Sequence, residues 1–403
     1  MAADPSSINS ALKETWTEER IAEQLYQDNP ILSRAKKLKN TQMGEYALTP
    51  IHVGRNWGWS ATSSSGGTLN SAGQQGYAQA QWAYTNQHTQ IKLQGSAIDQ
   101  TKGDALSVAN VVDEEISGAV NDLNRNISRQ IFSDGSGQIA QCGTTSSSTT
   151  ITLNATSGAN ALERGWIGVG AVIDIGTTAS SATIAAGVTI TAVDVANATI
   201  TVSGSAVSTT SSHYVSLQGA RTTAPASLEM NGLHNIVSTS ATLGGITTAA
   251  TPAWAAANAD STSQALTLAL LYTQNQKVAQ NTGTPADFVV TGLKQQRVAY
   301  TLAQAQVRFA SDSNLTVGSV EGVNINGVKL YGLPDCKNED IFFLTIGDLI
   351  SISAGDPYWQ SKVTGGENLV WVQGEDAYAG KLTVRMQLGC RRRNSHAKLS
   401  GLT

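Results

Sequence analysis

Charge and long apolar runs are scarce in this 403-residue chain, and each scarcity argues against a class of protein. Charged residues make up 14% of the sequence, well below the usual quarter, and the net charge is −4 at pH 7. Proteins whose main task is to grip nucleic acid present a basic face, so this charge argues against that task. No apolar run reaches the ~18–20 residues that span a bilayer.

Cysteine is also scarce, because only Cys142, Cys336 and Cys390 are present and they lie far apart. No CxxC pair exists, so a zinc knuckle or a redox motif is not expected. An odd, sparse count predicts three ordinary buried or half-buried thiols in a reducing compartment. Residues 1–30 lack a basic start followed by an apolar stretch, so we expect no secretory signal.

Catalytic and cofactor motifs are missing as well. The five histidines never lie at an i, i+4 spacing, and no GxSxG nucleophile elbow occurs. Around Lys381 the glycine spacing and the following Leu382 do not fit a phosphate-binding loop. A triad can assemble from distant residues, so these absences lower the expectation of an enzyme without excluding one. We expect no enzyme, no metal and no cofactor.

Two extended segments, 47–59 and 77–93, predict a long hairpin with the uncharged Gly/Ser/Asn-rich tip 60–76. Such a hairpin alone is only marginally stable in water. Something must therefore cover its aromatic side chains, either the parent domain or a neighbouring chain. These side chains, which we predict as intersubunit contacts, are Trp57, Trp59, Trp82 and Tyr84.

The clearest periodic signal predicts one helix over 105–132, roughly 42 Å long at 1.5 Å per residue. Gly135 and Gly137 follow its end. A helix of this length is typical of a spine rather than of a compact bundle. Its apolar stripe consists of Ala105, Val108, Ala109, Val112, Ile116, Ala119, Val120, Leu123, Ile127 and Ile131.

The N-terminal segment 11–26 predicts an amphipathic helix whose apolar face includes Leu12, Trp16 and Leu25. Two interpretations fit equally: an arm that packs on another subunit, with these three residues as contacts, or a first core helix. A short basic run follows, and its simplest interpretation is a solvated helix end. The run consists of Arg34, Lys36, Lys37 and Lys39.

Composition changes abruptly at 144–217, which contains only four charged residues. Short alternating runs separated by turn residues predict five or so strands in a small sandwich or barrel without helices. We interpret this segment as an inserted all-β domain. The four charged residues are Glu163, Arg164, Asp174 and Asp194.

The remaining chain, 218–403, predicts a mixture of helices and strands, so the fold class is α+β. Helices are expected over 262–280 and 293–310, a strand over 288–291, and a hairpin turn at Asn326-Gly327. Over 382–390 apolar and polar residues alternate, which predicts a half-buried antiparallel strand.

This order of elements resembles the tailed-phage major capsid proteins of the Hong Kong 97 type. The stretches that carry the resemblance are TPIHVGRNWGWS with YAQAQWAYTNQHTQIKL, ALSVANVVDEEISGAVNDLNRNISRQIF, NGLHNIV, PADFVVTGLKQQRVAYTL and DIFFLTIGDLISISAGDPYW with GKLTVRMQLGCRRR. The resemblance covers nearly the whole chain except 144–217, which is not part of the minimal fold. It rests on the order of the predicted elements and on the general character of their sequences, not on a catalytic signature.

The resemblance implies a domain layout and a role. The implied role is a structural, non-enzymatic subunit that forms pentamers and hexamers of an icosahedral head around double-stranded DNA. The implied partners are scaffolding, portal and decoration proteins, with no membrane and no sequence-specific DNA binding. The implied location is the virion capsid, assembled in the bacterial cytoplasm. The layout is an arm (1–46), an extended loop (47–101), a spine helix with peripheral domain (102–143), the inserted domain (144–217), and peripheral and axial domains (218–403).

Two other classes stay open at this point. An encapsulin-like nanocompartment shell shares the fold, and a surface-layer protein or adhesin would fit the Ser/Thr-rich strands of 144–217. Some capsid relatives also join a loop lysine to an asparagine of a neighbouring chain. In 47–101 the only lysine is Lys92, far from the tip, so we expect no covalent links between subunits.

Overall fold

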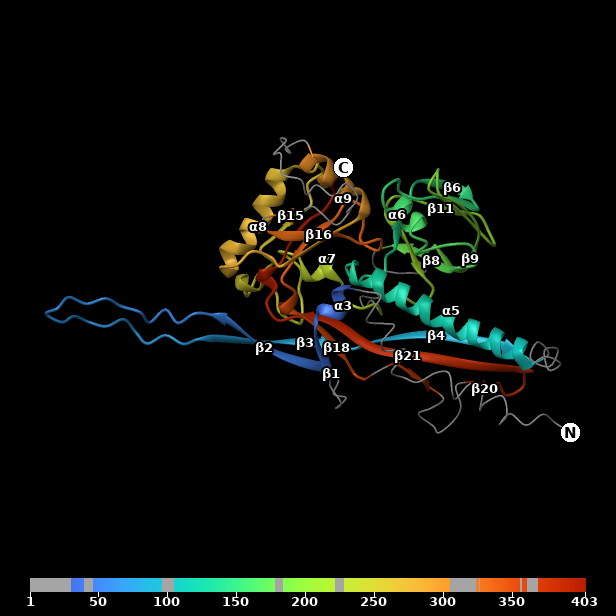
Figure 1. Cartoon of the computed structure of the whole chain (residues 1–403), viewed down its shortest axis with the longest axis horizontal. Helices are drawn as coiled ribbons and strands as arrows, with labels where there is room; N and C mark the ends of the chain where they lie inside the picture. The colour runs from blue at the N-terminus through green and yellow to red at the C-terminus, as the bar shows by residue number, and fades with distance from the viewer. Residues whose placement is uncertain are drawn as a thin grey trace, which may run out of the picture.

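The computed structural model describes residues 30–39, 46–95, 105–177, 184–221, 228–304, 324–325, 327–355, 357–360 and 369–403. These residues form a mixed α+β fold with few helices and many strands (Figure 1). A main body carries a long hairpin that projects away from it, and a β-rich unit lies on the opposite side, beyond the spine helix (Figure 1). Among the described residues, no helix is both long enough and apolar enough to cross a membrane.

One sheet of the main body is organised around the long strand β21 (Ala377–Cys390). On one side β21 pairs with β18 (Leu349–Ser353), which in turn pairs in parallel with the edge strand β1 (Lys36–Lys39). Strands β4 (Thr85–Gln94), β19 (Tyr358–Trp359) and β20 (Val370–Trp371) pair antiparallel with other parts of β21. Segments from both ends of the chain therefore meet in this sheet.

The spine helix α5 (Ala105–Ile131) lies along β4, as Figure 1 shows. This confirms the helix predicted over 105–132. Where the side chains are described, from residue 115 onward, the predicted stripe is buried in the main apolar core. The buried members are Ile116, Ala119, Val120, Leu123, Ile127 and Ile131.

The prediction of a half-buried strand over 382–390 is wrong, because β21 is covered on both faces there. Thr383 and Gln387, expected on a solvent face, are 2% and 4% exposed. Gln387 donates to the Ala83 carbonyl (2.9 Å) and accepts from the Asn231 amide (2.8 Å). A polar side chain that hydrogen-bonds to the backbone of another segment can be buried without the energetic cost of an unpaired polar group. The alternation of apolar and polar residues in the sequence does not reveal such a partner.

The hairpin is built from β2 (Tyr46–Gly54) and β3 (Gly76–Ala83), which pair antiparallel. The predicted single return strand 77–93 is wrong, because it divides at Tyr84. Beyond Tyr84 the chain becomes β4, which leaves the hairpin and pairs with Ala377–Met386 of β21. Because β4 pairs with β21 instead of β2, the paired part of the hairpin ends earlier than the sequence pattern indicates.

A second sheet of the main body has the order β13-β22-β17-β14-β16-β15. Its residues alternate between two apolar cores: Phe342 faces the main core, and Phe343 faces a core shared with the helices. Strands β14 and β17 are therefore buried on both faces. The six strands are β13 (Asn258–Asp260), β22 (Ala397–Leu399), β17 (Ile341–Leu344), β14 (Phe288–Thr291), β16 (Val328–Gly332) and β15 (Asn324–Ile325).

Helices α8 (Leu268–Thr282) and α9 (Leu293–Gln304) accompany this sheet. Helix α8 begins six residues later than predicted, because Thr267 caps it and its hydroxyl accepts from the Leu270 amide (3.3 Å). Gly283 ends α8 in the left-handed region at φ 81°, as expected of a glycine C-cap. The predicted helix 293–310 is confirmed to residue 304, and its remainder lies outside the described residues.

The β-rich unit, residues 139–217, has an apolar core of its own. Its main sheet has the order β5-β12-β8-β9-β10-β7, and an antiparallel bridge between Cys142 and Leu153 joins its two edges. The expected helix-free composition is wrong, because α6 (Ser157–Glu163) lies within it. The strands are β5 (Ala140–Gln141), β6 (Thr145–Ser148), β7 (Thr150–Thr152), β8 (Val172–Thr177), β9 (Ala185–Asp194), β10 (Thr199–Val202), β11 (Val207–Thr209) and β12 (His213–Leu217).

Short elements complete the main body. Helix α3 (Pro30–Arg34) buries Ile31 and Leu32 completely and anchors the beginning of the described chain. The interpretation of the basic run as a helix end is wrong for its lysines, because Lys36–Lys39 form the edge strand β1. The remaining elements are α7 (Leu233–Ile236), η1 (Pro252–Trp254), η2 (Ile346–Asp348) and η3 (Arg393–Ser395).

Candidate assembly surfaces

The projecting part of the hairpin carries large apolar side chains that its own chain does not cover. Trp57 and Trp59 are 76% and 79% exposed. The Arg55 guanidinium lies 4.6 Å from the ring centre of Trp57, a cation–π contact. Other exposed apolar side chains are Tyr46, Leu48, Leu69 and Tyr77. A concentration of apolar surface on one projection is typical of an interaction site.

Asparagine side chains hold the two chains of the hairpin together beyond its regular strands. Asn56 accepts from the Gly58 amide (2.7 Å) and donates to the Gly73 carbonyl (3.0 Å). Asn70 donates to the Trp59 carbonyl (2.9 Å) across the pair. These bonds fix the backbone that carries the two exposed tryptophans.

The base of the hairpin differs, because Trp82 and Tyr84 are covered there, although Tyr46 opposite Ala83 stays exposed. Trp82 is 1% exposed, and its Nε1 donates to the Thr49 hydroxyl (3.1 Å). A Cβ added at Gly389 would lie 3.0 Å from the Trp82 ring, so glycine is needed there for close packing. Tyr84 is half-buried against the main core. The four predicted contact residues thus divide into an exposed pair and a covered pair.

The predicted contact residues of the N-terminal segment, Leu12, Trp16 and Leu25, lie outside the described residues. The described chain begins at Pro30, where α3 is fixed by its buried face. Arg34 also stacks over the rings of Phe288 and Tyr331, at 4.9 and 5.2 Å from their centres. The first described residues are therefore firmly attached to the main body.

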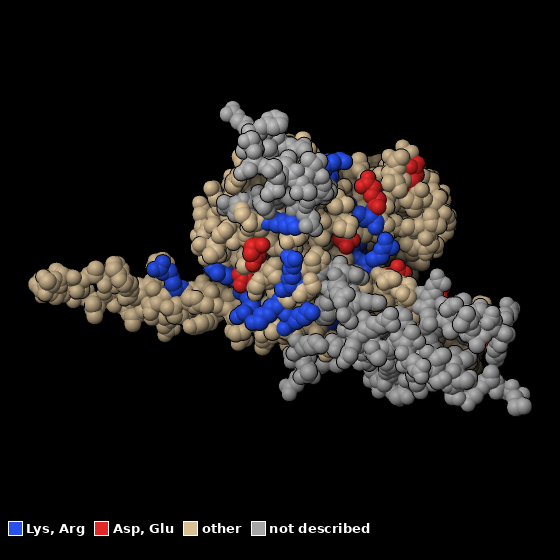
Figure 2. Space-filling view, viewed as in Figure 1, with Lys and Arg blue, Asp and Glu red and all other residues tan. Residues whose placement is uncertain are grey.

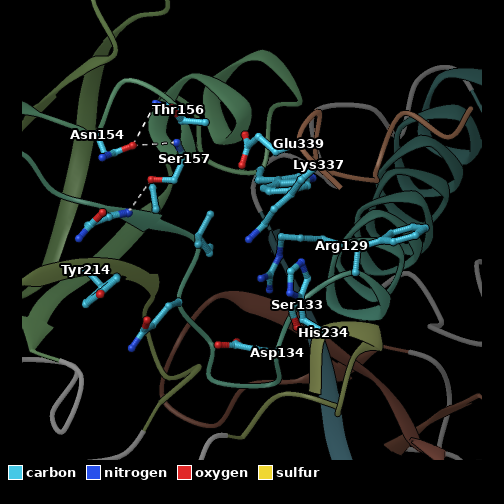
Figure 3. A pocket seen from close by; sticks show the side chains of 16 residues that line it. Arg129, Ser133, Asp134, Asn154, Thr156, Ser157, Tyr214, His234, Lys337 and Glu339 are labelled. Atoms are coloured by element: carbon cyan, nitrogen blue, oxygen red, sulfur yellow. Dashed lines mark hydrogen bonds between the residues drawn. The ribbon is translucent and has the colours of Figure 1, made fainter. Parts of the chain in front are cut away.

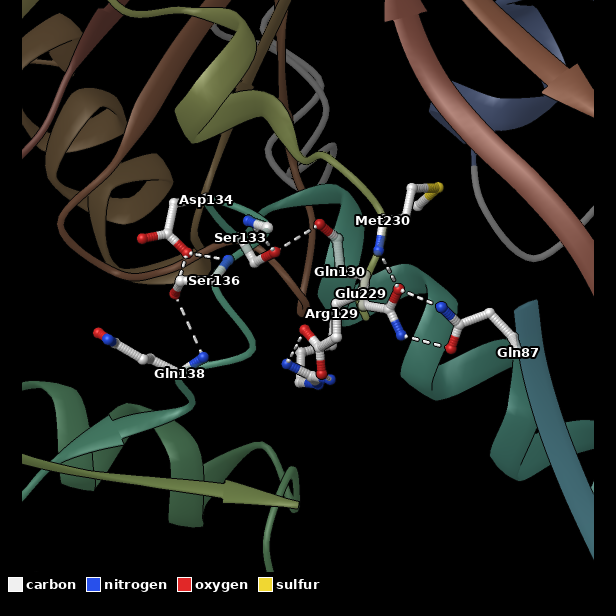
Figure 4. Close-up of polar contacts among 10 residues, drawn as sticks. Gln87, Arg129, Gln130, Ser133, Asp134, Ser136, Gln138, Glu229 and Met230 are labelled. Atoms are coloured by element: carbon white, nitrogen blue, oxygen red, sulfur yellow. Dashed lines mark hydrogen bonds and ion pairs between the residues drawn. The ribbon is translucent and has the colours of Figure 1, made fainter. Parts of the chain in front are cut away.

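The end of α5 carries a buried ionic and amide network that the sequence does not reveal (Figure 4). Arg129 and Glu229 form a two-pronged ion pair with side chains only 3% and 4% exposed. Next to it, Gln130 and Gln87 exchange two amide hydrogen bonds (3.0 and 3.1 Å). Gln130 also accepts from the Met230 amide (3.0 Å). This network ties the spine helix to β4 and to the segment before α7.

Arg164, just beyond α6, joins the β-rich unit to the main body. Its guanidinium donates to the carbonyls of Pro334 (2.6 Å) and Cys336 (2.8 Å) and to Oδ1 of Asn338 (3.0 Å). Burial lowers the pKa of Arg164, but neighbouring carboxylates oppose that shift. Asn160 adds a hydrogen bond to Glu339 from the same helix. Polar groups of α6 thus hold one loop of the main body.

A cavity of about 280 Å³ lies where the β-rich unit, the end of α5 and this loop meet (Figure 3). The labelled Arg129, His234 and Lys337 come from the main-body side, and Asn154 and Tyr214 come from the β-rich unit. Positive and negative side chains both line it. Among the described residues, no three His, Cys, Asp or Glu side chains come together as a metal site.

His234 lies between an acid and a base at the edge of this cavity. Its Nε2 is 2.6 Å from Asp340, and its Nδ1 accepts from the Lys398 amine (3.0 Å). Burial works to raise the pKa of Asp340, but its contact with His234 and the charges of Lys337 and Lys398 outweigh burial, so the pKa is lowered. Burial lowers the pKa of Lys398. These contacts link α7 to β22 and to the residue that precedes β17, so they hold the fold together.

No protein-family model and no curated protein matches this sequence. Among solved structures, the chain is similar to the capsid asymmetric unit of cyanophage A-1(L), with a TM-score of 0.58 and 14% identity over 93% of each chain. The capsid of a native GTA particle gives a TM-score of 0.49 and 7% identity over 92% of this chain and 89% of that one. From the cyanophage likeness, this chain has the fold of a phage capsid protein.

Proposed function

We propose that this chain is the major capsid protein of a tailed phage, with the Hong Kong 97-type layout and an inserted β-rich domain. It assembles into pentamers and hexamers of an icosahedral head that encloses double-stranded DNA. Its role is structural rather than catalytic, and its location is the virion capsid after assembly in the bacterial cytoplasm. Scaffolding, portal and decoration proteins are its other partners.

The observation that carries this proposal is the hairpin with exposed Trp57 and Trp59. A projection with so much apolar surface is stabilised when a neighbouring copy covers it. Because each subunit both offers a hairpin and receives one, the contact is head-to-tail and generates rings. Several modest contacts per subunit then add up to a stable shell. Trp82 and Tyr84 act indirectly, by fixing the base of the hairpin.

The test is assembly of a Trp57→Ser/Trp59→Ser variant, measured by sedimentation velocity. We expect the variant to stay as folded subunits or small oligomers, because hot-spot aromatic residues dominate interfaces. The matched control is Val169→Ser, which removes an exposed apolar side chain (68% exposed) from the β-rich unit and should assemble as wild type. Normal assembly of the tryptophan variant would contradict the proposal.

The domain layout follows the expected boundaries, with one refinement. Ile139, Ala140 and Cys142 belong to the core of the β-rich unit, which favours a boundary a few residues before 144. The unit folds independently and projects from the outer surface of the shell. Residues 11–29 pack across a subunit boundary, whereas the remainder of the expected arm, residues 30–39, packs within its own chain as α3 and β1. Deletion of residues 2–30 should leave a folded monomer that assembles poorly.

The shell holds without covalent links between subunits. Lys92 forms an ion pair with Glu375 of its own chain, and it lies in β4, in the sheet of the main body and away from the hairpin tip. This pairing supports a local role for the amine. Particles boiled in detergent should run as one band near 42.1 kDa, and a ladder of covalent pentamers and hexamers would contradict this.

An encapsulin-like nanocompartment is the alternative, because it shares the fold; such shells usually lack so long an extended loop and the insertion. The two functions differ in cargo. Nuclease-protected DNA inside purified particles supports the phage head, and packaged protein without DNA supports the compartment.

A further inference from the structure

Two basic segments far apart in the sequence meet at one corner of the β21 sheet. Lys36 pairs with Ile350 of β18, and the preceding Leu349 pairs with Cys390 at the end of β21. The next residue, Arg391, donates its amide to the carbonyl of Asp348 in η2 (2.8 Å). Element η2 in turn contacts both α3 and β1. We call this place the basic corner; its residues are Arg34, Lys36, Lys37, Arg391 and Arg392.

All five side chains of the basic corner are exposed. Figure 2 shows Lys and Arg side chains gathering near the base of the hairpin, where β1 lies, with few Asp and Glu beside them. The chain as a whole has more acidic than basic residues, 30 against 26. The corner is therefore a local reversal of the sign of the protein's net charge.

Protection of an edge strand against aggregation explains only part of the positive charge of the basic corner. Lysines on an edge strand discourage strand addition, which fits Lys36 and Lys37 on β1. That reason does not extend to Arg391 and Arg392, which follow the end of β21. Arg34 is held at the surface by its stacking on Phe288 and Tyr331. Arginines beside lysines are the composition that contacts phosphate oxygens.

We propose that the basic corner binds the phosphate backbone of double-stranded DNA, without reading its sequence, and so faces the enclosed genome. This inference rests on the proposed function of a DNA-filled shell. Five cations on an otherwise acidic subunit give weak, salt-sensitive binding at each copy. Such binding organises DNA along the wall and still lets it leave, because each contact exchanges readily with counterions.

The test measures binding of unassembled full-length chain to a labelled DNA duplex of about 30 base pairs, between about 50 and 200 mM NaCl. The Lys36→Gln/Arg391→Gln/Arg392→Gln variant should bind more weakly at low salt. Its slope of log affinity against log salt should be shallower by about 0.9 for each phosphate group that the variant no longer neutralises. The matched control is Arg125→Gln/Lys294→Gln/Arg297→Gln, three exposed cations elsewhere with the same change in net charge. We expect the control to keep the wild-type slope.

Three results would overturn the proposal: no DNA binding by the wild type, an unchanged slope in the corner variant, or an equal loss of affinity in the control. A corner variant that binds DNA normally but fails to form particles would show a protein interface instead, and would also overturn it. Particle formation by the wild type is measured separately. Its failure would count against the proposed function and leave a corner-dependent slope standing.

Discussion

The main body and the β-rich unit differ in what they bury. The main body encloses the Arg129–Glu229 ion pair, the fully buried Arg393 and the neutral His396. The β-rich unit encloses an apolar core with one buried carboxylate, Asp174, which accepts from the Gly187 amide (2.8 Å). Stability of the main body therefore depends on charge pairing and pH, whereas stability of the β-rich unit depends mainly on apolar packing.

Attachment also differs between the two regions. The main body shares one continuous apolar core among α3, α5, the hairpin base and two sheets. The β-rich unit has a separate core and is held largely through polar groups of α6, above all Arg164. A separate core with a polar junction is typical of a unit that unfolds on its own. Matched substitutions in the two regions can therefore test their independence.

The largest expected effect comes from a charge placed in either apolar core. Ile116→Asp should abolish folding of the main body, since a buried unpaired charge costs several kcal/mol and Ile116 is 1% exposed. Ile200→Asp should unfold only the β-rich unit and leave the main-body transition in place. Calorimetry and near-UV circular dichroism distinguish the two outcomes. Glu115→Gln, at an exposed position on α5, is the control. Normal assembly of Ile116→Asp would show that the stripe is not a core face.

A smaller effect is expected when the buried ion pair is broken. Glu229→Gln leaves the Arg129 charge buried without its partner, which should lower the free energy of unfolding of the main body by about 3–5 kcal/mol. Denaturant titration measures this change, and the transition of the β-rich unit should not move. The matched control is Glu375→Gln in the exposed pair with Lys92, where the change should be within about 1 kcal/mol. Equal effects of the two substitutions would contradict a special role of burial.

Acid should weaken the main body through His396. Burial and the charge of Arg393 lower the pKa of His396 to about 3. Its Nδ1 accepts from the Thr345 amide (3.2 Å), so its Nε2 carries the proton toward Cys390 Sγ (3.4 Å). Protonation would set a second N–H against the Thr345 amide and would add a charge beside Arg393.

The direction of the pH dependence of stability follows from this lowered pKa of His396. The unfolded state binds the proton more readily, so the stabilisation is complete above the ordinary histidine pKa and is lost as pH falls toward 3. Between pH 7 and 4 the main body should lose about 3 kcal/mol from this residue. Denaturant titrations at several pH values measure this, and His396→Asn should flatten the profile. A variant with an unchanged pH profile would refute this origin.

The smallest expected effect comes from a substitution of Arg164, at the junction between the β-rich unit and the main body. Arg164→Lys keeps the charge but loses the planar set of donors that reaches Pro334, Cys336 and Asn338. We expect about 1–3 kcal/mol of weakened docking, seen as faster hydrogen exchange in the loop 333–340, with both core transitions unchanged. If both cores were destabilised together, the two regions would not be independent.

Sequence periodicity predicted those elements whose apolar residues follow one period. The spine helix, with Val120, Leu123 and Ile127 on one face, was predicted to within one residue. Strand β14 was also predicted correctly, and so was the end of α8, from the glycine that follows the helix. In each case a local pattern agrees with the tertiary packing, so the pattern is sufficient.

The features that the sequence did not predict have one physical cause, which is packing between segments far apart in the chain. The break of the return strand at Tyr84 depends on β21, almost three hundred residues later. Burial of Gln387 depends on the backbones of Ala83 and Asn231. The Arg129–Glu229 ion pair and the hydrogen bonds of Arg164 also join segments far apart in the chain. Their residues are of types common on protein surfaces, so the sequence gives no sign that they are buried or paired. For the candidate site, sequence could predict the aromatic hairpin, but not which of its aromatic residues stay exposed.

The central claim, that this chain forms a closed shell through its projecting hairpin, is tested most directly by cryo-electron microscopy of the expressed full-length protein. We predict closed icosahedral particles in which each hairpin lies over a neighbouring subunit and buries Trp57 and Trp59 there. Monomers, small oligomers or planar arrays, or closed particles in which both tryptophans stay exposed to solvent, would contradict the claim.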